Sequence, residues 1–89
     1  MEKEKDVMGI GWVYRENGVE VLVAEGDGWA TIYTVKSTTP NKGYCQRLLR
    51  KLKDIYKDVD FGSTVALNEK MRYILQKLEI KEYTKIEKL

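Results

Sequence analysis

The spacing of apolar residues changes part-way along this chain of 89 residues. In the first part of the chain they alternate with polar residues, which is the period of a β-strand with one buried face. Three such runs predict strands at Val7–Tyr14, Val19–Ala24 and Trp29–Lys36. Between the first two runs, Asn17-Gly18 tolerates the positive φ angles of a type I′ turn. The first three strands are therefore expected to form an antiparallel meander.

Farther along, the apolar residues recur at helical spacing. One stripe, made of Cys45, Leu48, Leu49, Leu52, Ile55 and Tyr56, predicts a helix over Tyr44–Lys57. A second stripe, made of Met71, Ile74, Leu75 and Leu78, predicts a helix that ends near Glu79. Asn68 precedes the second stripe and is a suitable N-cap, because its side chain can accept a hydrogen bond from a first-turn N–H.

Two short apolar runs complete the pattern. Gly62–Leu67 and Ile80–Ile86 predict a fourth and a fifth strand, which makes the element order β-β-β-α-β-α-β. A crossover through a helix favours parallel placement of the third and fourth strands. The expected fold is thus α/β in the broad sense, a single α+β domain with a mixed sheet over residues 7–89. Met1–Asp6 alternate in charge and are expected to form a disordered tail.

Composition excludes several kinds of site. The chain has no histidine, which removes the common zinc constellations and the Ser-His and Cys-His pairs of nucleophilic catalysis. Cys45 is the only cysteine, so no disulfide can form within the chain. No apolar run approaches the ~18 residues of a membrane span, and residues 1–10 lack the pattern of a secretory signal. We therefore expect a cytoplasmic protein without a membrane partner.

The segment PNKGY, Pro40–Tyr44, leads directly into the first predicted helix. A helix N-terminus has unpaired N–H groups and carries about half a positive charge, so a tight turn at that point can bind an anion. Gly43 would let a phosphate approach the backbone amides of residues 42–46. Lys42–Lys57 also contains six basic residues against one acid. The alternative explanations are an ordinary turn glycine and a charged helix face that only meets solvent.

The segment Val35–Ile80 resembles the GNAT superfamily of acyl-CoA-dependent N-acetyltransferases. Its stretch KGYCQRLLRKL looks like the glycine-bearing turn and paired leucines that open the cofactor helix of that family. The stretch VALNEKMRYILQKLEI resembles the second signature of the family, a strand, an asparagine and a helix. The resemblance implies a GNAT-like fold that binds acetyl-CoA or coenzyme A, with third and fourth strands that separate at their ends. The residues that would contact the cofactor are then Val35, Lys42, Gly43, Tyr44, Cys45, Gln46, Arg47 and Asn68.

The chain also departs from that family. Pro40 stands where the turn usually has arginine or glutamine, and Cys45 replaces a second small residue. Leu75 occupies the position of a tyrosine that protonates the departing thiolate in many members, and Glu79-Ile80 replaces Gly-Phe. The first strand of the family and its two following helices have no counterpart, so a truncated member is expected. The weak candidates for a catalytic acid or base are Glu25, Tyr33, Tyr44 and Tyr73.

Three functions agree with these residues. The first is a minimal acyl-CoA-binding N-acetyltransferase whose acceptor site is completed by a homodimer or a partner protein. The second is a GNAT-like interaction or regulatory module without catalysis. The third, nucleic-acid binding, is the least favoured, because it needs Trp12, Tyr14 and Trp29 as stacking groups beside the basic helix. Cys45 could accept an acyl group, but its place on the apolar stripe favours a core residue.

Overall fold

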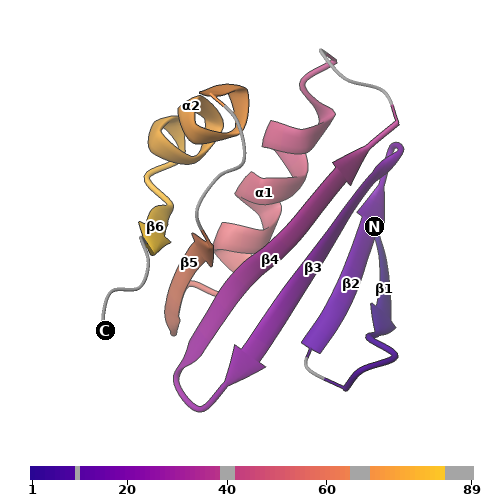
Figure 1. Cartoon of the computed structure of the whole chain (residues 1–89), viewed down its shortest axis with the longest axis vertical. Helices are drawn as coiled ribbons and strands as arrows, with labels where there is room; N and C mark the ends of the chain where they lie inside the picture. The colour runs from indigo at the N-terminus through magenta and orange to yellow at the C-terminus, as the bar shows by residue number, and fades with distance from the viewer. Residues whose placement is uncertain (10, 39–41, 65–68, 84–89) are drawn as a thin grey trace.

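The computed structural model describes residues 1–9, 11–38, 42–64 and 69–83. Within these ranges the elements follow the order β1 (Glu2–Lys5), β2 (Gly11–Glu16), β3 (Val19–Gly26), β4 (Trp29–Ser37), α1 (Tyr44–Ile55), β5 (Asp60–Thr64), α2 (Glu69–Lys77) and β6 (Lys81–Tyr83). The strands form one sheet in sequential order, β1-β2-β3-β4-β5-β6. The predicted α+β class is confirmed (Figure 1).

The sheet is mixed, as predicted. Strands β1 to β4 pair antiparallel, whereas β4 with β5 and β5 with β6 pair parallel. The turn between β2 and β3 has positive φ at both central residues, 51° at Asn17 and 79° at Gly18. Positive φ at both positions is the signature of the type I′ turn, because its twist matches that of the flanking strands. This predicted hairpin is therefore confirmed.

Both helices pack on the same face of the sheet. Leu48, Leu49 and Leu52 of α1 are fully buried and share one cluster with the fully buried or nearly buried valines of β3. Leu75 and Leu78 join the same cluster from α2 and the turn that follows it. The predicted stripes are thus confirmed, except at Ile55. That side chain is 49% exposed, because it lies at the margin of the stripe while Tyr56 takes the buried place.

The N-terminal residues are ordered into a strand, so the predicted tail is wrong. Glu2–Lys5 pairs with β2 antiparallel. Because side chains alternate across a strand, the two lysines lie on the helix-bearing face and the two glutamates on the other. Lys3 Nζ lies 4.3 Å from the ring centroid of Trp12, and Arg15 donates a 2.7 Å hydrogen bond to Glu4. Such long-range partners are not visible in the local charge pattern.

Several predicted boundaries also move. The strand expected from Val7 begins at Gly11, since Val7 and Met8 lie exposed in the turn between β1 and β2. The helix expected to reach Lys57 ends at Ile55. The fourth strand of the prediction begins two residues earlier, at Asp60. The last part of that prediction, the N-cap Asn68 and the end of the Ile80–Ile86 strand lie outside the described residues.

Helix α2 ends in a left-handed residue that is not glycine. Glu79 has φ 59°, and the N–H groups of Glu79 and Ile80 donate back to the carbonyls of Gln76 and Leu75 at 3.0 and 2.8 Å. This is the Schellman arrangement, in which the left-handed position usually holds glycine. A left-handed conformation costs a residue with a Cβ roughly 1–2 kcal/mol.

Glu79→Gly should raise the free energy of unfolding by about 1 kcal/mol, because the backbone strain is removed at an exposed position. Urea denaturation followed by circular dichroism measures this change. Glu69→Gly is the matched control, since it places glycine in the regular first turn of α2 and should lower stability by about 1 kcal/mol. Equal destabilisation by the two substitutions would contradict the assignment of strain to Glu79.

Candidate functional site

Strand β4 extends beyond its pairing with β5. The parallel register joins Trp29 with Asp60 through Ile32 with Ser63, at the N-terminal side of both strands. Beyond that point Thr64 Oγ1 lies 3.4 Å from the carbonyl oxygens of both Ile32 and Tyr33. Strand β4 continues to Ser37, whereas its described pairing with β5 ends at Ile32. Among the described residues no strand pairs with positions 34–36 on this side, and we call this stretch the free end of β4.

A bulge begins where β4 loses this partner. The register with β3 shifts between Leu22 and Val23, so that Val23 pairs with Ile32 but Leu22 pairs with Thr34, and Tyr33 is the extra residue. Ile32 and Val35 both face the helix side, where Ile32 is buried and Val35 packs on the core. Tyr33 lies between them and is 55% exposed. Bulges commonly re-aim side chains beside functional sites.

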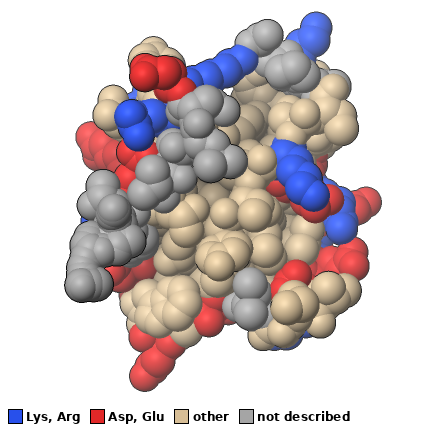
Figure 2. All heavy atoms as spheres, in the orientation of Figure 1, with Lys and Arg blue, Asp and Glu red and all other residues tan. Residues whose placement is uncertain are grey.

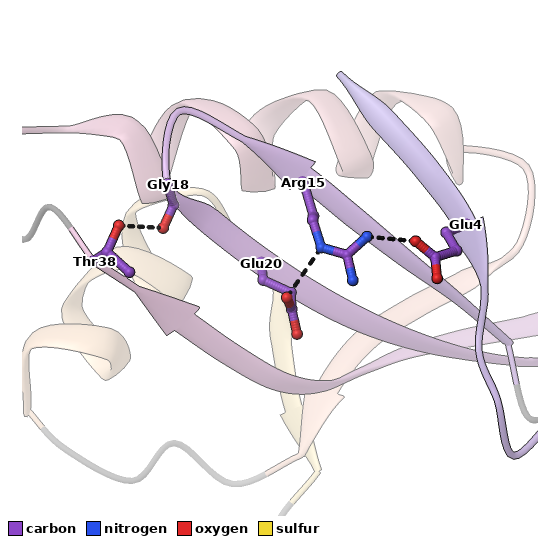
Figure 3. Close-up of polar contacts among 5 residues, drawn as sticks. All are labelled: Glu4, Arg15, Gly18, Glu20 and Thr38. Atoms are coloured by element: carbon purple, nitrogen blue, oxygen red, sulfur yellow. Dashed lines mark hydrogen bonds and ion pairs between the residues drawn. The ribbon is translucent and has the colours of Figure 1, made fainter.

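The chain leaving β4 is fixed at its end. Thr38 donates to the carbonyl of Gly18 twice, from its N–H at 2.9 Å and from its hydroxyl at 3.3 Å (Figure 3). These bonds attach the exit of β4 to the β2–β3 turn. Thr38, the residue that follows β4, is therefore held against the β2–β3 turn.

Gly43 forms the N-cap of α1 in a left-handed conformation, with φ 77°. Among the described residues no side chain caps this helix end, and its first turn contains no acidic residue. A Cβ built on Gly43 would meet no atom within 4 Å, so the turn faces open space. The predicted combination of a glycine turn with an uncapped helix N-terminus is present. Such an end offers backbone N–H donors and a positive dipole to an anion.

The predicted cofactor residues divide between this turn and the core. Lys42 and Arg47 are exposed, and the Arg47 guanidinium lies 5.8 Å from the ring centroid of Tyr44. Tyr44 and Cys45 are partly buried and pack on the core. Burial raises the pKa of the Cys45 thiol, opposed by a smaller effect of Lys70. A raised pKa lowers the thiolate fraction, which disfavours Cys45 as an acyl acceptor.

Two of the basic side chains on α1 are already engaged. Lys51 Nζ lies 2.8 Å from Glu16, and Lys53 Nζ donates to the carbonyl of Leu78 at 2.6 Å. Lys51 is also the main cause of the lowered pKa of Glu16. The basic residues on exposed parts of α1 and its flanking turns are Lys42, Arg47, Arg50, Lys51 and Lys57. Among the basic residues of α1 and its flanking turns, Lys42 and Arg47 are therefore the ones closest in sequence to the turn, and Lys70 of α2 acts on Cys45 from the neighbouring helix.

Glu25 lies away from this turn. It is near the end of β3, where Tyr56 donates a short hydrogen bond to its carboxylate. The Tyr56 hydroxyl is also 2.7 Å from the Tyr14 hydroxyl, and its ring stacks on Phe61. Tyr14 and Tyr56 are 1% and 9% exposed. Local sequence patterns do not reveal this chain of three oxygens, because only the tertiary fold brings β2, β3 and the end of α1 together.

The other catalytic candidates are also dispersed. Tyr33 belongs to the bulge of β4, Tyr44 begins α1, and Tyr73 lies on α2 with 62% of its surface exposed. In the part of the chain that the structure describes, no hydrogen bond joins any two of the four candidates. Only Tyr33 and Tyr44 lie on elements that border the turn. The geometry therefore does not assemble an acid–base pair from the predicted residues.

Comparisons with known proteins identify no relative. No family model, no curated protein and no solved structure matches the chain. The described helices include none with the length and apolar character needed to cross a membrane. The described residues also contain no group of three or more His, Cys, Asp or Glu side chains placed to hold a metal ion.

Tyr56→Phe should lower the free energy of unfolding by about 1–3 kcal/mol, because the buried hydroxyl of Tyr14 loses its partner. The double substitution Tyr14→Phe with Tyr56→Phe should be no less stable than Tyr56→Phe alone, since it leaves no buried hydroxyl unpaired. Urea denaturation of the three variants forms a double-mutant cycle. Additive losses would show that the two hydroxyls do not depend on each other.

The hydrogen-bonded pair of Tyr14 and Tyr56 also predicts that the free energy of unfolding depends on pH. Burial, followed by the hydrogen bond to Glu25, raises the pKa of Tyr56 above its ordinary range. The folded state therefore holds the neutral phenol, whose contribution is present below about pH 10 and is lost as the unfolded phenol ionises at higher pH. Stability measured between neutral pH and pH about 11 should fall more steeply in the wild type than in Tyr56→Phe. Equal slopes would contradict the raised pKa.

Proposed function

We propose that this chain binds an acyl-CoA, or coenzyme A, at the turn between β4 and α1, in the manner of a short GNAT-like domain. The observation that carries the proposal is the coincidence of two open backbone features on one segment. In the described part of the chain, the free end of β4 has no partner strand on the β5 side, and no described side chain caps the N-terminus of α1 at Gly43. Coenzyme A is an extended ligand with an amide-containing arm and a pyrophosphate, so it suits both features.

The proposed roles follow from the chemistry of each part. The amides from Gly43 to Gln46 would bind the pyrophosphate, because a helix N-terminus favours negative charge. Lys42 and Arg47 would contact phosphates at the exposed rim, where each contributes little. The free edge of β4 beside Val35 would pair with the amide groups of the arm, as an added strand does. Asn68 lies outside the described residues and keeps only the role that the resemblance implies.

The first candidate activity is transfer of the acetyl group from acetyl-CoA to an amine. An amine nitrogen would attack the thioester carbonyl carbon, the C–S bond would break, and the departing sulfur would take up a proton. Tyr33 and Tyr44 are the candidates nearest the free end of β4. The position where many family members carry the acid is occupied by Leu75, which is fully buried. A catalytic chain would therefore need a group from the acceptor side, supplied by a second copy or another protein.

The second activity is cofactor binding without transfer. It is favoured by the separation of the candidate groups, since Glu25 bonds to Tyr56 at the other end of α1 and Tyr73 lies exposed on α2. The positions of the aromatic residues make nucleic-acid binding less favoured than the amino-acid sequence alone does. Tyr14 is buried and cannot stack on a base, and Trp29 lies at the β3–β4 hairpin, across Gly26. The aromatic residues are thus not gathered beside the basic helix.

Coenzyme A titrated into ¹⁵N-labelled protein should shift the amides of Lys42, Gly43, Tyr44 and Gln46 first. Gly43→Ala should weaken binding about tenfold, because a Cβ strains the left-handed turn and obstructs the approach of phosphate. Gly28→Ala is the matched control. Gly28 has φ 78° and also faces open space, but it lies in the β3–β4 turn at the other end of α1.

The two glycine variants should lose similar stability, about 1–2 kcal/mol each, whereas only Gly43→Ala should lose affinity. Saturating coenzyme A without shifts at these amides would exclude the proposed function. Binding without release of thiol from acetyl-CoA in the presence of amines would assign the non-catalytic module. An oligonucleotide that binds with steep salt dependence and no sensitivity to Gly43→Ala would favour the nucleic-acid alternative instead.

A further inference from the structure

The face of the sheet opposite the helices has no covering element among the described residues. Both helices contribute to the cluster on the other face, which also takes the alternate residues Val19, Val21 and Val23 of β3. The residues between them, Glu20, Leu22 and Ala24, must therefore point to the uncovered face. Figure 2 looks onto this face in the orientation of Figure 1 and shows an uncharged area over the strands, with charged side chains toward the margins.

The uncharged area combines small apolar residues with large aromatic ones. By strand register it contains Val13, Leu22, Trp29, Thr31, Tyr33 and Thr34. Trp29 is 42% exposed, although its ring lies where a Cβ on Gly26 would be. Tyr33 is 55% exposed because the bulge turns it away from the core. We define these six residues as the open-face patch.

The charges around the open-face patch are largely paired within the chain. Arg15 bonds to Glu4 at 2.7 Å and to Glu20 at 3.1 Å, on β2 and its two neighbouring strands (Figure 3). At the other margin Lys81 and Asp60 lie 3.0 Å apart. The positive and negative side chains at these margins already form ion pairs with each other. Two copies whose margins meet therefore repel each other little. The margins also present no large excess of one sign that would select a charged partner.

The exposed edge of β1 is a poor alternative contact. Glu2 and Glu4 point to the open face, and Lys3 and Lys5 to the helix-bearing face. An antiparallel copy that continued the sheet about a twofold axis would keep the two faces continuous. Residues opposite each other share a face, so Glu would oppose Glu and Lys would oppose Lys. This edge therefore resists self-pairing, as edge strands commonly do.

From the open-face patch and its paired margins we infer that this face is the contact surface of a homodimer. The whole face, patch and charged margins together, consists of six strands. At about 4.8 Å apart and about 20 Å long, these strands span roughly 500 Å² of flat area on each copy. Two copies together then bury about 1,000 Å², which is at the lower limit for a specific interface. The dimer is expected to dissociate in the micromolar range. It does not depend on the cofactor proposed above.

Sedimentation velocity over a micromolar concentration series tests the dimer. Tyr33→Glu should weaken association by about tenfold or more, because it places a charge in the open-face patch. Tyr73→Glu is the matched control, since Tyr73 is similarly exposed but lies on α2, on the other side of the sheet. The control should associate like the wild type. Circular dichroism checks that both variants are folded, and Thr31→Lys replaces Tyr33→Glu if that variant does not fold.

Trp29 provides a second measurement that needs no substitution in the patch. In a Trp12→Phe variant, the emission of Trp29 should shift to shorter wavelength as the protein concentration rises, because association buries its ring. A monomer at every concentration, with constant emission, would overturn the inference and leave the face for a different protein. A dimer that forms equally well in Tyr33→Glu would also overturn the inference. So would a dimer that Tyr73→Glu weakens as much as Tyr33→Glu does.

Discussion

The contact between the leucines of α1 and the valines of β3 organises the whole molecule. Leu48, Leu49 and Leu52 are fully excluded from solvent against strand residues that are themselves buried. Close-packed aliphatic contacts of this kind supply most of the stabilisation in a small domain. The crossovers from β4 to β5 and from β5 to β6 move in the same direction along the sheet. With the usual right-handed connection, both helices then fall on one face, and no described element covers the opposite face.

The bulge at Tyr33 is explained by the burial of apolar side chains of β4 against the helices. Strand β4 begins with Ala30 and Ile32 facing the core, and a regular alternation would turn Val35 away from it. The extra residue restores Val35 to the core side, opposite Val21. The bulge therefore keeps both halves of a long strand packed on one set of helices. It also turns Tyr33 outward at the point where β5 stops pairing, which gives the candidate site and the open-face patch a common structural origin.

Local patterns were sufficient to predict the elements that bury a continuous stripe. The period of two predicted β2, β3 and β4, the helical period predicted α1 and α2, and Asn17-Gly18 predicted the hairpin. The patterns could not predict β1, because its lysines and glutamates gain their partners from Trp12 and Arg15 across strands. They also missed the link from Glu25 through Tyr56 to Tyr14, where a tyrosine on an apolar stripe has no local sign of a buried polar partner. The turn at Gly43 was visible because glycine and a missing acidic cap are local features, whereas the free edge of β4 depends on the length of its neighbour.

The two faces of the sheet differ in the charges that they carry. The helix side carries the exposed cations of α1 together with Lys3 and Lys5, whereas the open face pairs Arg15 and Lys81 with carboxylates. An anion is therefore attracted to the helix side, and apolar association is least opposed on the other. A dimer through the open face would stack two sheets between two outer layers of helices. The N-terminus of each α1 would then stay at the surface of the assembly, so that self-association and anion binding do not compete for the same residues. Tyr33 would be the exception, because its place in the bulge puts it both beside the free end of β4 and within the dimer contact.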